Sequence, residues 1–163
     1  MNLRPRLGST LLGRQTLHAL KALMVLAEEP QHWRSAADLA ACQELPAALL
    51  EQQLLRLRRA GLLQARRGRA GGYRLAMAPQ AINLTAVLSA MRPDGSGQPG
   101  GHAPAPNHPD PELAATDRVA ALLENRLWRS VAQELDNCTL ADLLHDLRSA
   151  RALLGEGGGW LLG

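Results

Sequence analysis

Residues 49–76 read LLEQQLLRLRRAGLLQARRGRAGGYRLA and predict two different structures in succession. In the first half, Leu50, Leu54 and Leu57 recur at intervals of four and three, the spacing of one face of an α-helix. The second half contains two short segments on either side of GRAGG, whose glycines suit a tight hairpin turn. The stretch therefore predicts a helix followed at once by a two-stranded hairpin.

The limits of both elements can be read from the same region. Pro46 suits the first position of the helix, which runs to about Ala60, and Gly61 is the residue type that often follows a helix end. We expect the two strands at 62–67 and 73–77. Opposite the leucine stripe, four polar side chains are predicted to face outward: Gln52, Gln53, Arg56 and Arg59.

A shorter helix precedes this unit. Ser35 and Asp38 have the spacing of a capping box, which opens a helix that ends near Gln43. Two helices joined by a short turn occur in many helical proteins, so this feature alone is a weak signal. A helix-turn-helix followed directly by an arginine-bearing hairpin is the winged-helix arrangement. The sequence therefore predicts a winged helix-turn-helix unit.

Further helices are predicted on both sides of this unit, over residues 10–28, 84–91, 111–136 and 140–154. Asn83 is a suitable cap for the second of them, and Thr139 with Asp142 forms a second capping box before the last. The chain is rich in leucine and alanine and only 2% aromatic, which favours helix over strand. The predicted fold class is mostly α, formally α+β, with a two-stranded wing and a long C-terminal dimerisation helix.

We expect four segments along the chain. They are a winged helix-turn-helix DNA-binding domain (1–92), a flexible Pro- and Gly-rich loop (93–111), a dimerisation helix with a last helix (112–154) and a flexible tail (155–163). The dimer is predicted because an apolar stripe on the long helix needs a partner surface, most simply the same helix of a second chain. That stripe consists of Leu123, Leu127, Val131 and Leu135.

Charge is unevenly distributed, although the net charge is only +3. Residues 1–93 hold 13 Lys or Arg against 5 Asp or Glu, whereas residues 94–163 hold 5 against 10. Between Glu51 and Asp94 there are eight arginines and no acidic residue. A merely solvated face would mix the two signs, so this pattern favours a polyanionic partner, most commonly nucleic acid. We expect the glycines to let the hairpin tip enter a narrow groove, where the arginines meet phosphates.

Several function classes are not supported by the sequence. Two widely separated cysteines, Cys42 and Cys138, are no disulfide framework and predict buried thiols in a reducing compartment. Neither a signal peptide nor an apolar run of about 18 residues is found, so we expect a cytoplasmic protein. There is no nucleophile–base motif, paired-carboxylate site or P-loop, and an enzyme is not predicted.

Three blocks of the chain together resemble the Rrf2 family of winged-helix transcription regulators. They are LGRQTLHALKALMVLA (12–27), the stretch from LLEQ to SAM (49–91) and LWRSVAQELDNCTLADLL (127–144). The resemblance extends over about residues 8–147, and its LEQ and RGxxGGYxL elements are specific. It implies a repressor or activator that acts as a homodimer, with one recognition helix per subunit in a major groove and the wings at the flanking minor grooves.

The resemblance also implies which residues contact double-stranded DNA. Glu51 and Gln52 match the LEQ pair that faces bases. Arg67 matches the arginine of the wing's RG motif, and Gly68, Gly71, Gly72 and Tyr73 match the rest of that motif. Together with the arginine pattern, the predicted DNA-binding residues are Glu51, Gln52, Gln53, Arg56, Arg59, Arg66, Arg67, Gly68, Arg69, Gly71 and Gly72. The chain departs from the family at the helix start, where Pro46, Ala47 and Ala48 replace polar residues, and at Leu49, where an aromatic residue is usual. Apolar contact with thymine methyl groups is one way to replace the missing hydrogen bonds.

A larger departure concerns sensing. Cluster-binding members of the family have three closely spaced cysteines in the loop that corresponds to 93–111, where this chain has none, and Asn125 stands where a histidine is often found. We therefore predict a regulator with no iron–sulfur cluster and no other cofactor. Two alternatives remain: an interaction module that has lost DNA binding, and a metal or redox sensor that uses His102, His108 or Cys138.

Overall fold

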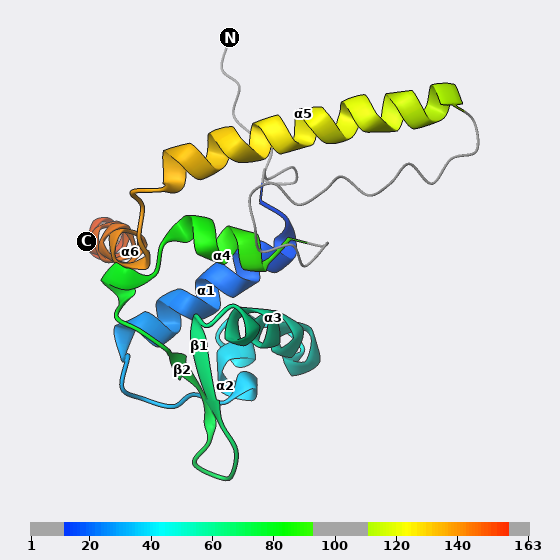
Figure 1. Cartoon of the computed structure of the whole chain (residues 1–163). Coiled ribbons are helices and arrows are strands. Elements are labelled where there is room, and N and C mark those ends of the chain that lie inside the picture. The colour runs from blue at the N-terminus through cyan, green and yellow to red at the C-terminus, as the bar shows by residue number, and fades with distance from the viewer. Residues whose placement is uncertain (1–11, 93–110, 157–163) are drawn as a thin grey trace.

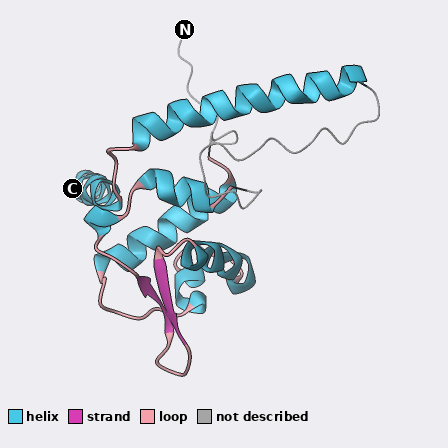
Figure 2. Ribbon diagram, viewed as in Figure 1, coloured by secondary structure: helices cyan, strands magenta, loops and turns pink. Residues whose placement is uncertain are grey.

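The computed structural model describes residues 12–92 and 111–156 (Figure 1). The elements are α1 (Arg14–Glu28), α2 (Ala36–Ala41), α3 (Ala47–Arg59), β1 (Leu63–Arg66), β2 (Gly72–Leu75), the 3-10 turn η1 (Pro79–Ala81), α4 (Leu84–Ala90), α5 (Pro111–Leu135) and α6 (Leu140–Glu156). Figure 2 shows a helical protein with a single antiparallel hairpin in its described part, β1–β2. The predicted fold class is therefore confirmed. The loop predicted over 93–111 and the tail predicted over 155–163 lie almost wholly outside the described residues, as does the predicted start of the first helix.

The predicted helix caps are present. Ser35 and Asp38 form the capping box of α2: Ser35 Oγ accepts from the Asp38 N–H at 3.1 Å, and Asp38 Oδ2 accepts from the Ser35 N–H at 3.3 Å. Before α6, Asp142 Oδ2 likewise accepts from the Thr139 N–H at 2.8 Å. Hydrogen bonds from Ser35 hold the pKa of Asp38 below its ordinary value, and those from Thr139 lower the pKa of Asp142.

The start of α3 differs slightly from the prediction. Pro46 was expected at the first helical position, but its ψ of 131° is extended, and the helix begins at Ala47. Gly61 has a φ of +76°, a conformation that residues with a side chain rarely adopt. The predicted helix stop at Gly61 is therefore confirmed.

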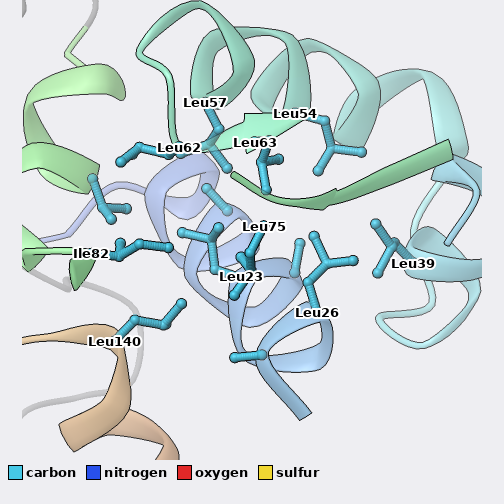
Figure 3. Packing of buried hydrophobic residues seen from close by; sticks show 14 of the residues in the cluster. Leu23, Leu26, Leu39, Leu54, Leu57, Leu62, Leu63, Leu75, Ile82 and Leu140 are labelled. Carbon is cyan, nitrogen blue, oxygen red and sulfur yellow. The ribbon is translucent and has the colours of Figure 1, made fainter. Parts of the chain in front are cut away.

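The core lies where α1, α3 and the wing strands meet, and leucines fill most of it. Figure 3 shows Leu23 and Leu26 of α1 among side chains from α3, β1 and β2. Leu140, at the start of α6, is also fully buried, and its N–H donates to Ile82 O at 2.8 Å. The sequence grouped α6 with the dimerisation helix and gave no sign that its first turn completes the core of the winged unit.

Helix α5 extends away from this core. Its 25 residues span about 37 Å, and in Figure 1 its first half projects beyond the other helices. Near its C-terminal end, Thr85 Oγ1 of α4 donates to Ala132 O at 3.2 Å, and the guanidinium of Arg92 lies 4.9 Å from the centre of the Trp128 ring. In the part of the chain that the structure describes, no helix is long and apolar enough to cross a membrane.

Candidate DNA-binding surface

The first half of α3 exposes both apolar and polar side chains on its outward face. Glu51 and Gln52 are exposed, as predicted, while Leu50, Leu54 and Leu57 are fully buried on the opposite face. Leu49 is 56% exposed and adds an apolar side chain to this face. The face can therefore offer both amide hydrogen bonds and apolar contact to a partner.

The prediction that Gln53 faces outward is wrong. Its side chain is only 5% exposed, because residues 50, 53, 54 and 57 share one face of a helix with 3.6 residues per turn. Gln53 Oε1 accepts no hydrogen bond from any described residue. A side chain enclosed in this way cannot reach a base edge, so Gln53 does not belong to the exposed surface.

Arg56 is half-buried and links two helices. Its Nη1 donates to Met91 O at 3.5 Å, at the C-terminal end of α4, where the helix dipole favours a positive charge. The sequence predicted only an outward position for this residue. Arg58 and Arg59, in the last turn of α3, are exposed.

The wing is the hairpin formed by β1 and β2, and Figure 1 shows its tip pointing away from the helices. The strands pair from Leu63 with Leu75 to Arg66 with Gly72. In the turn, Gly71 N–H donates to Gly68 O at 2.9 Å, and Gly68 has a φ of +104°. A Cβ on Gly71 would lie 2.2 Å from Arg66 O, so this tight tip requires glycine. Its two arginines, Arg67 and Arg69, are exposed as predicted.

A short segment before α2 pairs with strand β2 along the edge of the wing. Arg34 N–H donates to Tyr73 O at 3.0 Å, and Tyr73 N–H donates to Arg34 O at 2.8 Å. Gly72 makes this approach possible: its φ is +137°, and a Cβ there would lie 2.3 Å from Arg34 O. Burial, together with the negative charge of Glu51, raises the pKa of the Tyr73 hydroxyl. The wing is thus fixed to the helix-turn-helix by backbone pairing that sequence reasoning missed.

This segment also brings an aromatic ring to the wing arginines. The guanidinium carbons of Arg66 and Arg74 lie 4.7 Å and 4.6 Å from the centre of the Trp33 ring. Arg74 Nε donates to Gln64 Oε1 at 3.1 Å. Neither Trp33 nor Arg74 is among the predicted site residues, because the residues between the first two helices show no periodicity and the sequence marks Arg74 only as one of the run of arginines.

The arginines of α3 and the wing form no ion pairs with the described carboxylates. Among the described residues, ion pairs are formed by Glu29 with Arg34 and His32 and by Glu28 with Arg151. Within residues 12–92, no arginine between positions 56 and 74 has an acidic partner. The arginines of the wing and of the end of α3 therefore carry positive charge that no ion pair among the described residues offsets.

The predicted dimer stripe on α5 is largely open. Leu123 and Leu127 are 57% and 59% exposed, Val131 is 40% exposed, and Leu135 is half-buried. Leucines exposed to this extent in a row on one helix are typical of a surface that binds a partner.

A comparison with protein families matches residues 12–146 to the model of the Rrf2 family, described as an iron-dependent transcriptional regulator. The chain belongs to the Rrf2 family. An HTH-type transcriptional regulator of Synechocystis sp. is 37% identical over 141 residues, which cover 86% of this chain and 91% of that relative. The HTH-type transcriptional regulator IscR of Cereibacter sphaeroides is 29% identical over 126 residues, or 74% of this chain and 73% of IscR.

Solved structures of Rrf2-type regulators have the same architecture. CymR, the global cysteine regulator of B. subtilis, is 27% identical with a TM-score of 0.59, over 84% of this chain and 98% of CymR. T. potens IscR is 26% identical with a TM-score of 0.61, over 88% of this chain and 91% of that chain. The protein is accordingly a DNA-binding transcription regulator with a winged-helix fold.

The iron dependence in the family's description can be tested against the side chains of this chain. Cys42 lies at the end of α2 and is exposed, contrary to the expected burial, and Cys138 lies between α5 and α6. Residues 12–92 and 111–156 contain no group of three or more His, Cys, Asp or Glu side chains arranged to hold a metal ion. An iron–sulfur cluster normally takes four protein ligands, chiefly thiolates. Two cysteines on separate elements do not fit such a cluster, while His102 and His108 lie outside the described residues.

Proposed function

We propose that this Rrf2-family regulator binds its operator as a homodimer, with α3 of each subunit in a major groove and each wing at the flanking minor groove. One observation supports this most strongly: the last turn of α3 and the wing tip present exposed arginines, and none of these arginines has an acidic partner among the described residues. Phosphate contacts by arginines fix position on the duplex, and contacts from the helix face read the bases. An interaction module without DNA binding would not be expected to keep so many unpaired guanidiniums.

The side chains on α3 favour particular bases. The Gln52 amide can pair with adenine through two hydrogen bonds, and the Glu51 carboxylate can accept from the amino group of cytosine. Exposed Leu49 and the neighbouring Ala48 can contact the thymine methyl group, because they have no polar atom that would lose its hydrogen bonds. We therefore propose a half-site in which an A·T base pair lies next to a C·G base pair.

The wing tip serves the minor groove in this proposal. Arg67 and Arg69 are exposed on a turn whose glycines keep it narrow, and arginine is attracted to the strong negative potential of a narrow minor groove. Arg59 and Arg66 add phosphate contacts. Gly68, Gly71 and Gly72 act through backbone shape, since they set the turn and let Arg34 approach.

Dimerisation is assigned to α5. The exposed stripe of Leu123, Leu127 and Val131 is buried when α5 pairs with its copy across a two-fold axis. The same axis would place the two recognition helices about one DNA turn apart. We propose that residues 12–92 bind DNA, that α5 pairs the subunits, and that the protein acts in the cytoplasm without an enzymatic activity or an iron–sulfur cluster.

Selection of duplexes from a random-sequence library tests this function. The purified protein should enrich a two-fold symmetric site whose half-sites are centred about 10 base pairs, or one helical turn, apart. The double variant Glu51→Ala/Gln52→Ala keeps every arginine and should still bind DNA, but it should lose the enrichment of the A·T and C·G pairs that these two side chains contact. If the unaltered protein enriches no common sequence, or enriches a site without two-fold symmetry, the proposed mode of binding is wrong.

A further inference from the structure

Trp33 lies at the junction between the helix-turn-helix and the wing, and two arginines from different strands meet its ring. Arg66 comes from β1 and Arg74 from β2, at 4.7 Å and 4.6 Å from the ring centre. Both distances are within the range of a cation–π interaction, for which tryptophan is the strongest aromatic partner. The ring is half-buried, as is Arg74, while Arg66 is exposed.

Backbone pairing explains why the Trp33 ring lies against the two arginines. The antiparallel bridge between Arg34 and Tyr73 places Trp33 opposite Arg74, and side chains opposite each other in antiparallel strands share one face. Gln64 pairs with Arg74 in the hairpin, and Arg66 is two residues further along the same face of β1. The stack is therefore a consequence of strand register.

Other contacts hold the two guanidiniums in one orientation. Arg74 Nε donates to Gln64 Oε1 at 3.1 Å, and Arg66 Nη2 donates to the carbonyl of Ala70 in the wing turn. A guanidinium that stacks through its face keeps its N–H groups in the plane, where they can donate to phosphate oxygens. Neither arginine has an acidic partner within the described ranges.

We propose that Trp33 is a positioning residue for DNA binding, which holds Arg66 and Arg74 ready for phosphates on the face of the wing that Gln64 shares with them. This inference rests on the proposed function, because it needs the wing to lie against the duplex. Flexible arginines lose rotamer freedom when they bind, and a ring that has already ordered them removes that cost. Trp33 thus acts through the arginines and does not itself need to touch DNA.

Two replacements of Trp33 separate this role from ordinary packing. Trp33→Phe keeps an aromatic face and should bind operator DNA within about fivefold of the unaltered protein. Trp33→Leu keeps an apolar side chain of useful size but offers no ring, and should weaken binding on the order of 10- to 100-fold, because four arginines per dimer lose their order. Circular dichroism melting curves confirm that both variants fold, and binding is measured by fluorescence anisotropy with a labelled duplex.

Combining the Trp33 variant with arginine variants distinguishes the proposed role from simple packing, because a packing role would not depend on the two arginines. In an Arg66→Ala/Arg74→Ala background, Trp33→Leu should have no further effect on affinity, since its targets are gone. The arginine double variant should also reduce the slope of log affinity against log salt by about one per lost phosphate contact, whereas Trp33→Leu alone should leave the slope unchanged.

Three results would overturn the proposal. They are full affinity in Trp33→Leu, an equal loss from Trp33→Leu with and without the two arginines, and full affinity with an unchanged salt slope in Arg66→Ala/Arg74→Ala. In each of these cases the unaltered protein still binds its operator, so the proposed function survives. If the unaltered protein binds no duplex, the proposed function fails first and this inference fails with it.

Discussion

Replacement of Gln52 by alanine should remove sequence discrimination while leaving general DNA affinity in place. Gln52 is exposed on α3 beside Leu49, whereas the exposed arginines of the same helix, Arg58 and Arg59, lie in its last turn. A bidentate pair between a glutamine and adenine contributes about 1–3 kcal/mol of discrimination, or about 5- to 150-fold per half-site. Affinity for unrelated DNA comes from the arginines, which this change does not touch, and should stay within about twofold.

The adjacent glutamine supplies a matched control. Gln53 has the same side chain but is only 5% exposed among core leucines, so Gln53→Leu should keep the ratio of operator to random-duplex affinity. Both variants are titrated by fluorescence anisotropy against the selected operator and a scrambled duplex at one fixed salt concentration. Equal loss on both duplexes in Gln52→Ala, or loss of discrimination in Gln53→Leu, would refute the assignment of the recognition face.

Three further predictions concern assembly, acid stability and sensing. Light scattering at micromolar concentration should give twice the chain mass of 17.5 kDa, and Leu127→Asp should yield a folded species of 17.5 kDa; an unaltered protein of 17.5 kDa contradicts the dimer. Because the folded-state pKa of Asp38 and of Asp142 lies below the ordinary 3.8, their contribution to the free energy of unfolding is present above about pH 4 and is lost as pH falls through the folded values. Urea unfolding from pH 7 to pH 3 should therefore show a smaller decline in Asp38→Asn/Asp142→Asn than in the unaltered protein, and an identical decline would be the opposing result. Protein purified without oxygen should be colourless, with operator affinity unchanged by iron chelators; a brown preparation with stoichiometric iron and sulfide would contradict the absence of a cluster.

Features encoded by neighbouring residues could be predicted from the sequence. The leucine spacing in α3, the capping boxes at Ser35 and Thr139 and the glycines of the wing turn each specify local geometry within a few residues. The winged helix-turn-helix follows from their order along the chain.

Features that depend on contacts between distant segments were missed. The pairing of Arg34 with Tyr73 joins residues that lie far apart in sequence, and the intervening periodicity does not indicate it. Burial of Leu140 beneath α1 is missed for the same reason, because an apolar stripe shows that a helix needs a partner and does not identify that partner.

The sequence predicted which residue types form the candidate site more accurately than where their side chains lie. The absence of acidic residues between Glu51 and Asp94 indicated a positive surface, and the wing arginines lie on it. The prediction for Gln53 is wrong because its polarity, like that of Gln52 beside it, does not show which way the side chain points from the helix. Arg56 similarly uses its guanidinium to contact Met91 O, which only the packing of α4 on α3 reveals.

The salt dependence of operator binding tests most directly whether the arginine surface contacts the DNA backbone. A dimer that places the exposed arginines of α3 and the wing on DNA should neutralise on the order of 6 to 10 phosphates, and its affinity should fall about 10³- to 10⁵-fold between 50 and 200 mM salt. Titrations of one labelled operator duplex across that range, with protein concentration expressed as dimer, give the slope. A steep linear fall of log affinity with log salt is the predicted result, and a flat dependence would contradict it.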